Sequence, residues 1–283
     1  GLKMLSEDQG DAFVSAGSTG ALLSGATLVV KRVKGIRRAA MGPMMPNKAG
    51  GKTMLLDCGA NAECTPEFLL QFGLVGSLYM KKQGIENPRV GLINNGAEEH
   101  KGNELYQETY KLLKDSNLNF IGNVEGKEVP FGKCDVLVAD GFTGNIILKL
   151  IEGMGSFFMK RMKRMLYANI CTKLSALVLK KELHRLKHDF DASEAGGSPF
   201  LGISKPVIKA HGNSDAKAIK NAVRQAIFFV ETGINNDITI FAEDYDEKKG
   251  LYLGRDEFGR MGYFKSEKNA IGEFIRLKIT KAN

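Results

Sequence analysis

The sequence of 283 residues contains no tryptophan, and its four cysteines, Cys58, Cys64, Cys134 and Cys171, form no CxxC pair. Zinc sites and disulfide-stabilised secreted scaffolds use closely spaced cysteines, so the cysteine usage indicates neither and fits a reducing cytoplasm. No apolar run approaches the ~20 residues of a transmembrane helix, and the start of the sequence lacks a signal-peptide pattern. The sequence therefore predicts a cytoplasmic protein that does not span a membrane.

Several catalytic motifs are also absent. The sequence has neither G-x-x-x-x-G-K-[ST] nor G-x-G-x-x-G, so ATP hydrolysis and hydride transfer lose support. It has no H-E-x-x-H motif, no G-x-S-x-G elbow and no close carboxylate pair at a predicted strand end, which weakens metallohydrolase, serine hydrolase and glycosidase interpretations.

Positive charge and glycine are abundant. Forty Lys and Arg against 32 Asp and Glu give a net charge of +8, and the 33 glycines exceed the ~7% typical of proteins. Nine basic residues and one acid, Glu182, lie between Lys160 and Lys187, and the rest of the chain is formally neutral. A surplus confined to one segment argues against a nucleic-acid-binding surface.

The same basic segment is amphipathic. Its apolar residues recur at spacings of four, four and three, which places them on one helical face: Leu166, Ile170, Leu174 and Leu177. Basic residues, Lys173 and Lys180 among them, flank this stripe, as in a helix that rests on anionic lipid. A dimer interface, contact with an acidic carrier protein and simple core packing remain alternatives.

Apolar runs of strand length alternate with helical patterns, which predicts βαβ units and a parallel sheet. We expect strands at 12–16, 53–57, 89–94, 135–140 and 206–210, and helices at 21–34, 66–82, 103–115, from about 146, and at 215–231. The segment 235–283 differs, because short alternating runs around 251–253 and 262–264 are separated by glycine. That pattern predicts a β-hairpin.

Glycine and small polar residues follow each of the five predicted strands. Parallel strands end at one edge of a sheet, where unpaired N–H groups of the following helices can hold an anion. The loops therefore predict a phosphate site, although turn geometry alone explains any single loop. The candidate residues are Gly17, Ser18, Thr19, Gly20, Asn61, Gly141, Thr143, Gly144, Asn213 and Ser214.

Three further polar residues lie in these loops. Lys101, just before a helix, is placed to face a phosphate or a developing oxyanion, or is a solvated lysine. His211 lies at the end of an apolar strand. It is either an acid or base in the reaction or a histidine held at the edge of the core. Asn145 is placed to donate to a reacting carbonyl or merely to cap its helix.

Six segments follow one another along the chain: DAFVSAGSTGAL (11–22), LDCGAN (56–61), GNE (102–104), FIGNVE (120–125), ADGFTGN (139–145) and IKAHGNSD (208–215). Their order resembles that seen in the PlsX family, the acyl-ACP:phosphate acyltransferases of bacterial phospholipid synthesis. The sequence over about 2–233 resembles that family. The resemblance implies a Rossmann-like αβα sandwich of the isopropylmalate dehydrogenase/phosphotransacetylase type, with a protruding amphipathic helical segment.

The resemblance also implies an activity. Acyl-ACP and inorganic phosphate would give acyl phosphate and free carrier protein, without a metal or nucleotide, in a protein that is usually a homodimer. By matching position, Lys101 and Asn145 are the catalytic residues, with His211 as a further candidate. The segment 157–190 resembles the family's helical tip, so we expect peripheral contact with an anionic membrane at its inner face.

The resemblance divides the chain into two parts. Residues 1–234 would form the acyltransferase domain, including the tip at 157–190, and 235–283 an extension of unknown role. The family's opening strand and helix, with an Asp-Ala-Met-Gly-Gly-Asp turn, find no match, so the first domain is expected to lack its N-terminal part. A short-chain phosphotransacylase using acyl-CoA and an inactive module that binds a carrier or membrane remain alternatives. A metal-dependent dehydrogenase would need an aspartate cluster that Asp57 and Asp140 do not supply.

Overall fold

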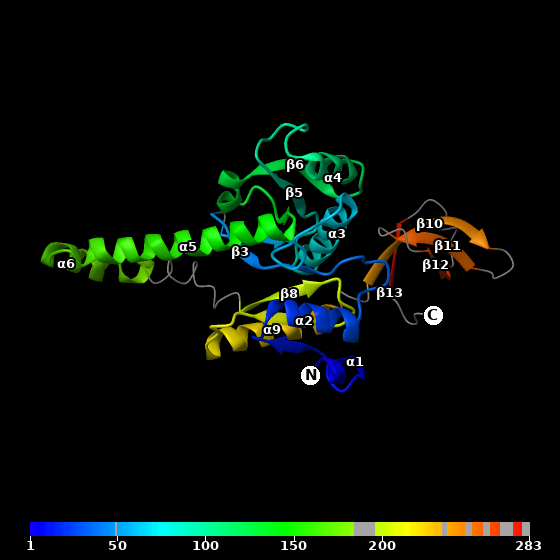
Figure 1. The fold of residues 1–283 in the computed structure, drawn as a ribbon, viewed down its shortest axis with the longest axis horizontal. Helices are drawn as coiled ribbons and strands as arrows, with labels where there is room; N and C mark the ends of the chain where they lie inside the picture. The colour runs from blue at the N-terminus through cyan, green and yellow to red at the C-terminus, as the bar shows by residue number, and fades with distance from the viewer. Residues whose placement is uncertain are drawn as a thin grey trace.

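The structure is a computed structural model that describes residues 1–48, 50–183, 196–233, 237–246, 251–256, 261–266 and 274–278. Within these ranges the strands form three sheets. Two of them build two neighbouring lobes, and a long helix extends outward from them (Figure 1). We call residues 1–41 with 196–233 the first lobe and residues 44–183 the second lobe.

The second lobe contains a five-stranded sheet in the order β3-β4-β7-β5-β6. β3 is antiparallel to β4, and the other neighbouring strands are parallel. The central strand β7 is fully buried, and so are the inner residues of its neighbours β4 and β5, as expected for apolar strands covered on both faces. The strands are β3 (Met44–Pro46), β4 (Lys52–Leu56), β5 (Arg89–Asn94), β6 (Asn119–Glu125) and β7 (Val136–Val138), and the helices are α3 (Pro66–Lys82), α4 (Glu104–Lys114), the 3-10 helix η2 (Gly126–Phe131) and α5 (Gly141–Leu166).

The first lobe contains a four-stranded sheet in the order β1-β9-β8-β2. β1 and β9 are parallel, whereas β8 is antiparallel to both of its neighbours. α2 continues directly into a π-helix, η1. The elements are α1 (Leu2–Ser6), β1 (Phe13–Ser15), α2 (Thr19–Gly25), η1 (Ala26–Val30), β2 (Ala40–Met41), β8 (Gly197–Leu201), β9 (Val207–Ala210) and α9 (Ala216–Thr232).

The two lobes share one hydrophobic core. Tyr79 of α3 contacts Phe228 and Phe229 of α9, with ring centroids 5.9 and 5.5 Å apart. Where the chain passes from β2 to β3, the backbone N–H of Gly42 donates to Pro199 (3.1 Å) and the carbonyl of Pro43 accepts from Leu55 (3.1 Å). The lobes therefore form a single packed body.

α5 is 26 residues long, or about 39 Å, and extends well beyond the body (Figure 1). It ends at Leu166, and a separate helix, α6 (Ile170–Val178), begins after a short break. Asn169 caps α6, because its side chain accepts from the N–H of Thr172 (2.9 Å). The described helices include none whose length and apolar character would suit a membrane crossing.

The C-terminal strands form an antiparallel sheet in the order β12-β11-β10-β13. The predicted hairpin is confirmed, since Leu253 pairs with Tyr263, but it belongs to a larger sheet. The strands are β10 (Asp237–Asp246), β11 (Leu251–Asp256), β12 (Met261–Phe264) and β13 (Phe274–Lys278).

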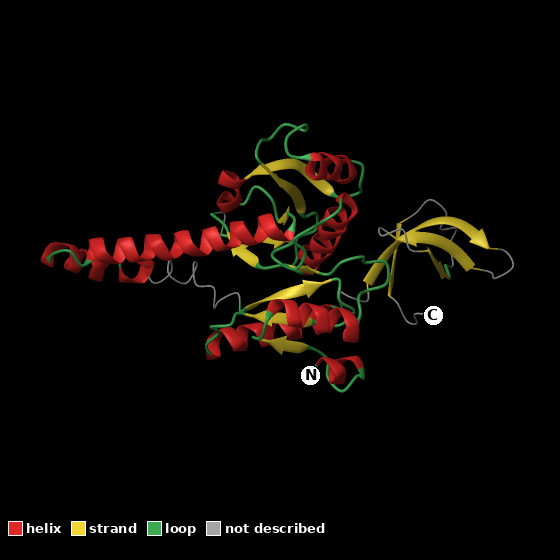
Figure 2. Cartoon of the chain, in the orientation of Figure 1, coloured by secondary structure: helices red, strands yellow, loops and turns green. Residues whose placement is uncertain are grey.

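Most predicted helices and strands are confirmed to within a few residues. Figure 2 shows the observed helices in red and the strands in yellow. Two predicted bounds were wrong. α5 begins at Gly141 rather than near 146, because the Asp140 side chain caps it there, and the helix after β1 ends at Val30 rather than 34. Strand β8, at Gly197–Leu201, falls in no predicted element. Strands β2, β3 and β6 were not predicted.

The predicted apolar stripe of the basic segment is also interrupted. Leu166 is the last residue of α5, whereas Ile170, Leu174 and Leu177 lie on α6. The capping of α6 by Asn169 starts a new helix and breaks the continuous face that the spacing predicted. Residues 184–190 of the predicted tip lie outside the described residues.

Candidate active site

The five predicted glycine-rich loops lie on two sheets rather than at one edge. The loops after β4, β7 and β5 belong to neighbouring parallel strands of the second lobe, and those after β1 and β9 to neighbouring parallel strands of the first. The prediction of a single edge was wrong, because strand order is set by long-range pairing. Lys101 and Asn145 follow adjacent strands, β5 and β7, while His211 follows β9.

Asp57 fixes the loop after β4. Its buried carboxylate accepts from the backbone N–H groups of Met41 (2.8 Å), Cys58 (2.6 Å) and Asn61 (2.5 Å), and from Asn61 Nδ2 (3.0 Å). Burial raises the pKa of Asp57 to about 6, against the hydrogen bonds, which lower it. Because Met41 ends β2, this carboxylate also joins the loop to the first lobe.

The first turn of α5 packs directly on that loop. The N–H of Gly141 donates to the Asn61 carbonyl (2.7 Å), and those of Phe142 and Thr143 donate to Asp140 Oδ1 (both 2.9 Å). The N–H of Gly144 donates to the Asp140 carbonyl (2.9 Å). These backbone N–H groups therefore already donate hydrogen bonds within the chain, although the sequence predicted three of these residues to lie in the phosphate site.

Two glycines permit this packing. A Cβ on Gly144 would lie 1.9 Å from the carbonyl oxygen of Asp57, and one on Gly141 would lie 2.5 Å from that of Asn61. Any side chain would therefore push α5 away from the loop after β4.

Asn145 is exposed and faces the same loop. A Cβ built on Gly59 would lie 3.6 Å from Asn145 Cγ, and Gly59 itself has a φ of +97°, which favours glycine. Asp140 caps α5, so Asn145 does not fill that role. Its amide is left at the loop surface.

A network of side-chain amides holds the loop that carries Lys101. Asn94 Nδ2 donates to the Lys101 carbonyl (3.1 Å) and to Asn123 Oδ1 (3.1 Å), and buried Asn123 donates to the Glu98 carbonyl (2.7 Å). Gly96 leaves room for the Lys101 stem, since a Cβ there would lie 2.8 Å from Lys101 Cγ. Among the described residues, the half-buried Lys101 makes no ion pair.

Tyr106 links the Lys101 loop to the start of α5. Its hydroxyl donates to Asp140 Oδ2 (2.6 Å), which also accepts from Thr143 Oγ1 (2.7 Å). Burial, followed by the hydrogen bond to Asp140, raises the pKa of Tyr106 above its ordinary value. Nothing in the sequence singled out Tyr106, and Asp57 and Asp140 were considered only as metal ligands. An aspartate followed by glycine after an apolar strand, as at Asp140, is nevertheless a recognisable signal for a helix cap.

The loops of the first lobe differ in having free donors. α2 begins after Ser18, which makes no capping hydrogen bond, and in the described chain the first-turn amides of Thr19, Gly20 and Ala21 have no acceptor. Such donors at a helix start favour an anion.

The adjoining loop after β9 carries the remaining predicted residues. His211 and Asn213 are exposed, so His211 does not lie at the core edge. Ser214 Oγ is buried with no hydrogen-bond partner in the described part of the chain, and Asp215 caps α9 by accepting from Ala218 N–H (2.8 Å). The described residues contain no group of three His, Cys, Asp or Glu side chains placed to hold a metal.

Comparison with known proteins shows to which family the chain belongs. Residues 1–237 match the family described as fatty acid synthesis protein. A phosphate acyltransferase of Thermoanaerobacter pseudethanolicus is 52% identical over 239 residues, covering 84% of this chain and 72% of that protein. The phosphate acyltransferase of Clostridium novyi is 50% identical over 238 residues, covering 84% and 71%.

A solved structure shares the fold. A phosphotransacetylase from Streptococcus pyogenes matches with a TM-score of 0.56 and 16% identity, over 82% of this chain and 66% of its own. At this identity the likeness concerns the fold alone, and it confirms the predicted Rossmann-like α/β class.

Proposed function

Because the chain belongs to the family described as fatty acid synthesis protein, with phosphate acyltransferases as close relatives, we propose that it transfers a long-chain acyl group from acyl-carrier protein to inorganic phosphate. The relatives' names support acyl transfer to phosphate. The proposal goes further than those names in two respects: the acyl donor is bound to a carrier protein, and the product is used in phospholipid synthesis.

The reaction depends little on a general base. A phosphate oxygen attacks the thioester carbonyl carbon, a C–O bond forms, and the C–S bond breaks as the thiolate leaves. Phosphate is already nucleophilic, so the protein must position it and stabilise the oxyanion of the tetrahedral intermediate.

Lys101 and Asn145 have the chemistry for those tasks. The Lys101 ammonium would offset the charge of phosphate, and the Asn145 amide would donate to the oxyanion. The observation that carries this assignment is that both follow adjacent strands, Lys101 in the loop before α4 and Asn145 near the start of α5. The hydrogen bond from Tyr106 of α4 to Asp140 (2.6 Å) joins the starts of these two helices. A fixed separation between two donors is what oxyanion stabilisation requires.

The first lobe would contribute the remaining contacts. The backbone N–H groups of residues 19–21, which have no acceptor in the described chain, support the turn 17–20 as the phosphate site rather than 141–144, whose N–H groups donate within the chain. Asn213 and Ser214 adjoin it because β9 pairs with β1, and Asn61 acts by shaping its own loop. Exposed His211 would protonate the departing thiolate.

Replacing Lys101 or Asn145 by alanine tests these roles. Each change is expected to lower turnover by roughly 10²-fold, measured as acyl phosphate formed from acyl-ACP and phosphate. Exposed Lys111 and Asn87 provide matched controls, because Lys111→Ala and Asn87→Ala should leave turnover near that of the wild type. Near-normal turnover in folded Lys101→Ala and Asn145→Ala proteins would remove the assignment, and activity with acyl-CoA alone would favour a short-chain phosphotransacylase.

We assign α6 to contact with an anionic membrane, at the inner face of the cytoplasmic membrane. Ile170, Leu174 and Leu177 are 76%, 59% and 67% exposed, and Lys173 and Lys180 beside them are exposed too. Leu166 is only half-buried at the end of α5. An uncovered apolar face with basic flanks supports a helix lying at a lipid interface.

Sedimentation with phosphatidylglycerol vesicles tests this assignment. Leu174→Asp is expected to weaken binding by about tenfold or more, because one buried apolar side chain contributes about 1.5–3 kcal/mol. Ser175→Asp adds the same charge at a neighbouring exposed position without removing an apolar group, so it should bind more tightly than Leu174→Asp. Failure of the wild type to sediment at low salt would count against lipid contact.

We further propose that residues 1–234 act as the acyltransferase unit, with 157–190 as its tip, and that 235–283 is an extension. The end of the family match at residue 237 supports this division. The exposed apolar side chains on α5, Phe142, Ile146 and Leu150, support a homodimer in which a second copy covers them.

A further inference from the structure

A second basic segment lies far from the tip. Five basic residues and no acid occupy eight positions between η1 and β2: Lys31, Arg32, Lys34, Arg37 and Arg38, which we call the basic loop. All five are exposed. Outside the basic loop and 160–187, acidic residues outnumber basic ones by five, so the positive surplus sits on two separate surfaces rather than one.

The backbone of the basic loop is held at its start and again at residues 35 and 37. Val33 N–H donates to the Gly202 carbonyl (2.9 Å), and the Lys31 carbonyl accepts from Ser204 (2.9 Å). Gln71 of α3 holds the second half of the loop, accepting from Arg37 N–H (2.8 Å) and donating to the Gly35 carbonyl (3.0 Å). The charges are therefore presented on a preorganised segment, which reduces the entropy lost on binding.

The basic loop adjoins the candidate active site. The Arg38 guanidinium lies 5.6 Å from the centre of the Phe68 ring on α3. The next residue, Ala39, accepts a hydrogen bond from Asn61 Nδ2 (2.8 Å), in the loop that Asn145 faces. By contrast, the last residue of α5 lies 21 positions beyond Asn145, or about 30 Å along the helix.

We propose that the basic loop is the surface on which an acidic carrier protein docks to deliver its acyl thioester. This inference rests on the proposed function, since a carrier must bring its thioester to the catalytic residues, and the basic loop is the basic surface beside them. Its two apolar residues, Val33 and Ile36, are half-buried and buried. Lipid contact needs apolar side chains to insert, so the loop suits a protein partner and the tip suits a membrane.

The charge reversal Arg37→Glu/Arg38→Glu tests the proposal against Lys160→Glu/Lys163→Glu, which alters two exposed basic residues on the distal part of α5. The first variant is expected to raise the KM for palmitoyl-carrier protein about tenfold, with a weaker dependence of KM on salt. The KM and kcat for palmitoyl-pantetheine, which has the thioester but no carrier, should be unchanged. The α5 variant should keep its KM for the carrier and lose vesicle binding.

Carrier affinity measured by calorimetry without phosphate makes the test independent of turnover. A basic-loop variant that binds palmitoyl-carrier protein as tightly as the wild type would overturn the proposal. So would equal losses with carrier and pantetheine substrates, or a loss of vesicle binding alone, which would make the loop a lipid surface. If the wild type binds the carrier through the loop but makes no acyl phosphate, the docking surface stands and the proposed reaction fails.

Discussion

Gly144 sets how closely α5 approaches the loop after β4. Its Cα lies where any Cβ would meet the Asp57 carbonyl oxygen at 1.9 Å. Asp57 in turn organises four hydrogen bonds beneath Asn145 and Gly59. A substitution of Gly144 is therefore expected to disturb the packing of α5 on this loop together with the position of Asn145.

Gly144→Ala is expected to destabilise the protein by about 1–3 kcal/mol, because overpacking forces the backbone to shift, and to lower turnover by displacing Asn145. Gly153→Ala, on an open part of the same helix, should instead stabilise it by about 0.5–1 kcal/mol. Urea unfolding and acyl phosphate assays compare the two. Equal stability of both variants would contradict the packing role.

At this scale the sequence predicted where the glycine-rich loops lie, after β1, β4, β5, β7 and β9, but not the hydrogen bonds that each loop residue makes. Glycines 141 and 144 were interpreted as anion-binding, whereas they allow close packing and their amides are already bonded. The difference could not be predicted, because a glycine in a turn has the same pattern whether it faces an anion or another backbone. Asp57 and Asp140 were visible, but their partners Met41 and Tyr106 come from distant parts of the chain.

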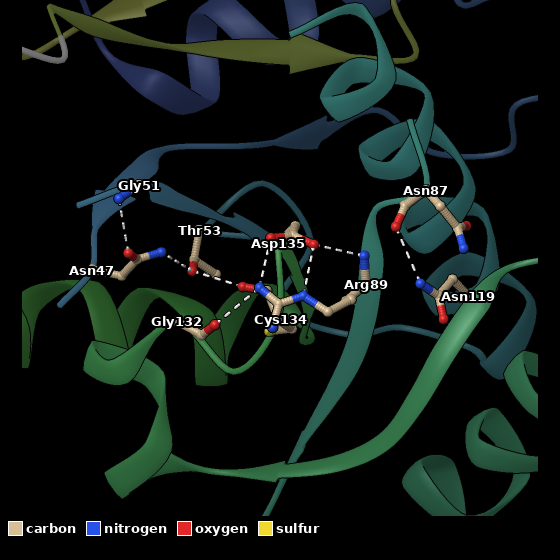
Figure 3. A network of polar contacts seen from close by, with 9 residues as sticks. All are labelled: Asn47, Gly51, Thr53, Asn87, Arg89, Asn119, Gly132, Cys134 and Asp135. Carbon is tan, nitrogen blue, oxygen red and sulfur yellow. Dashed lines mark hydrogen bonds and ion pairs between the residues drawn. The ribbon is translucent and has the colours of Figure 1, made fainter. Parts of the chain in front are cut away.

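At the scale of elements, a polar cluster joins the strands at the edge opposite the candidate site (Figure 3). Arg89, at the start of β5, donates to Asp135 before β7 through Nε (3.0 Å), NH2 (2.9 Å) and its backbone N–H (2.8 Å). Thr53 of β4 donates to the Cys134 carbonyl (2.9 Å). The cluster thus ties β4, β7 and β5 where their chains enter the sheet.

Asp135→Asn is expected to lower the free energy of unfolding at pH 7 by about 1–3 kcal/mol. Burial raises the pKa of Asp135, but the hydrogen bonds and charge of Arg89 outweigh it and hold the pKa below its ordinary value. The stabilisation is therefore present above about pH 4 and is lost as pH falls through the lowered pKa. Denaturant unfolding between pH 3 and 7 should show the wild type and variant converging in acid.

The same variant separates stability from catalysis. Lys101 and Asn145 lie at the far ends of these strands, so the KM for phosphate should stay unchanged in Asp135→Asn. A changed KM would mean that the two edges of the sheet are coupled.

Long apolar elements were the most predictable. β5 was predicted at its observed bounds, and α3 with its first-turn Pro66 likewise. Strands β2 and β3 have only two and three residues, which is too short for an alternation of apolar and polar residues to be recognised. The start of α5 was misplaced because two glycines in five residues resemble a turn, and only the cap from Asp140 makes them helical.

At the scale of the whole molecule, the apolar face of α5 near the body has no cover in the described chain. Phe142, Ile146 and Leu150 are 64%, 51% and 62% exposed at spacings of four. Burying such side chains in a second copy would contribute about 1.5–3 kcal/mol each.

Analytical ultracentrifugation is expected to find a dimer of the wild type and a shift toward monomer in Ile146→Asp/Leu150→Asp. Lys149→Ala, at an exposed position between them, should remain dimeric. A monomeric wild type at micromolar concentration would contradict the homodimer.

The arrangement of the lobes in the chain has a consequence for how the protein is made. β1 pairs with β9, with Phe13 opposite Val207. The strands of the first lobe therefore come from two parts of the sequence, one before and one after the whole second lobe. During synthesis the second lobe is complete while β1 still lacks its neighbour. Contacts so distant in sequence close slowly, and the first lobe must therefore assemble last, on a surface that the second lobe has already formed.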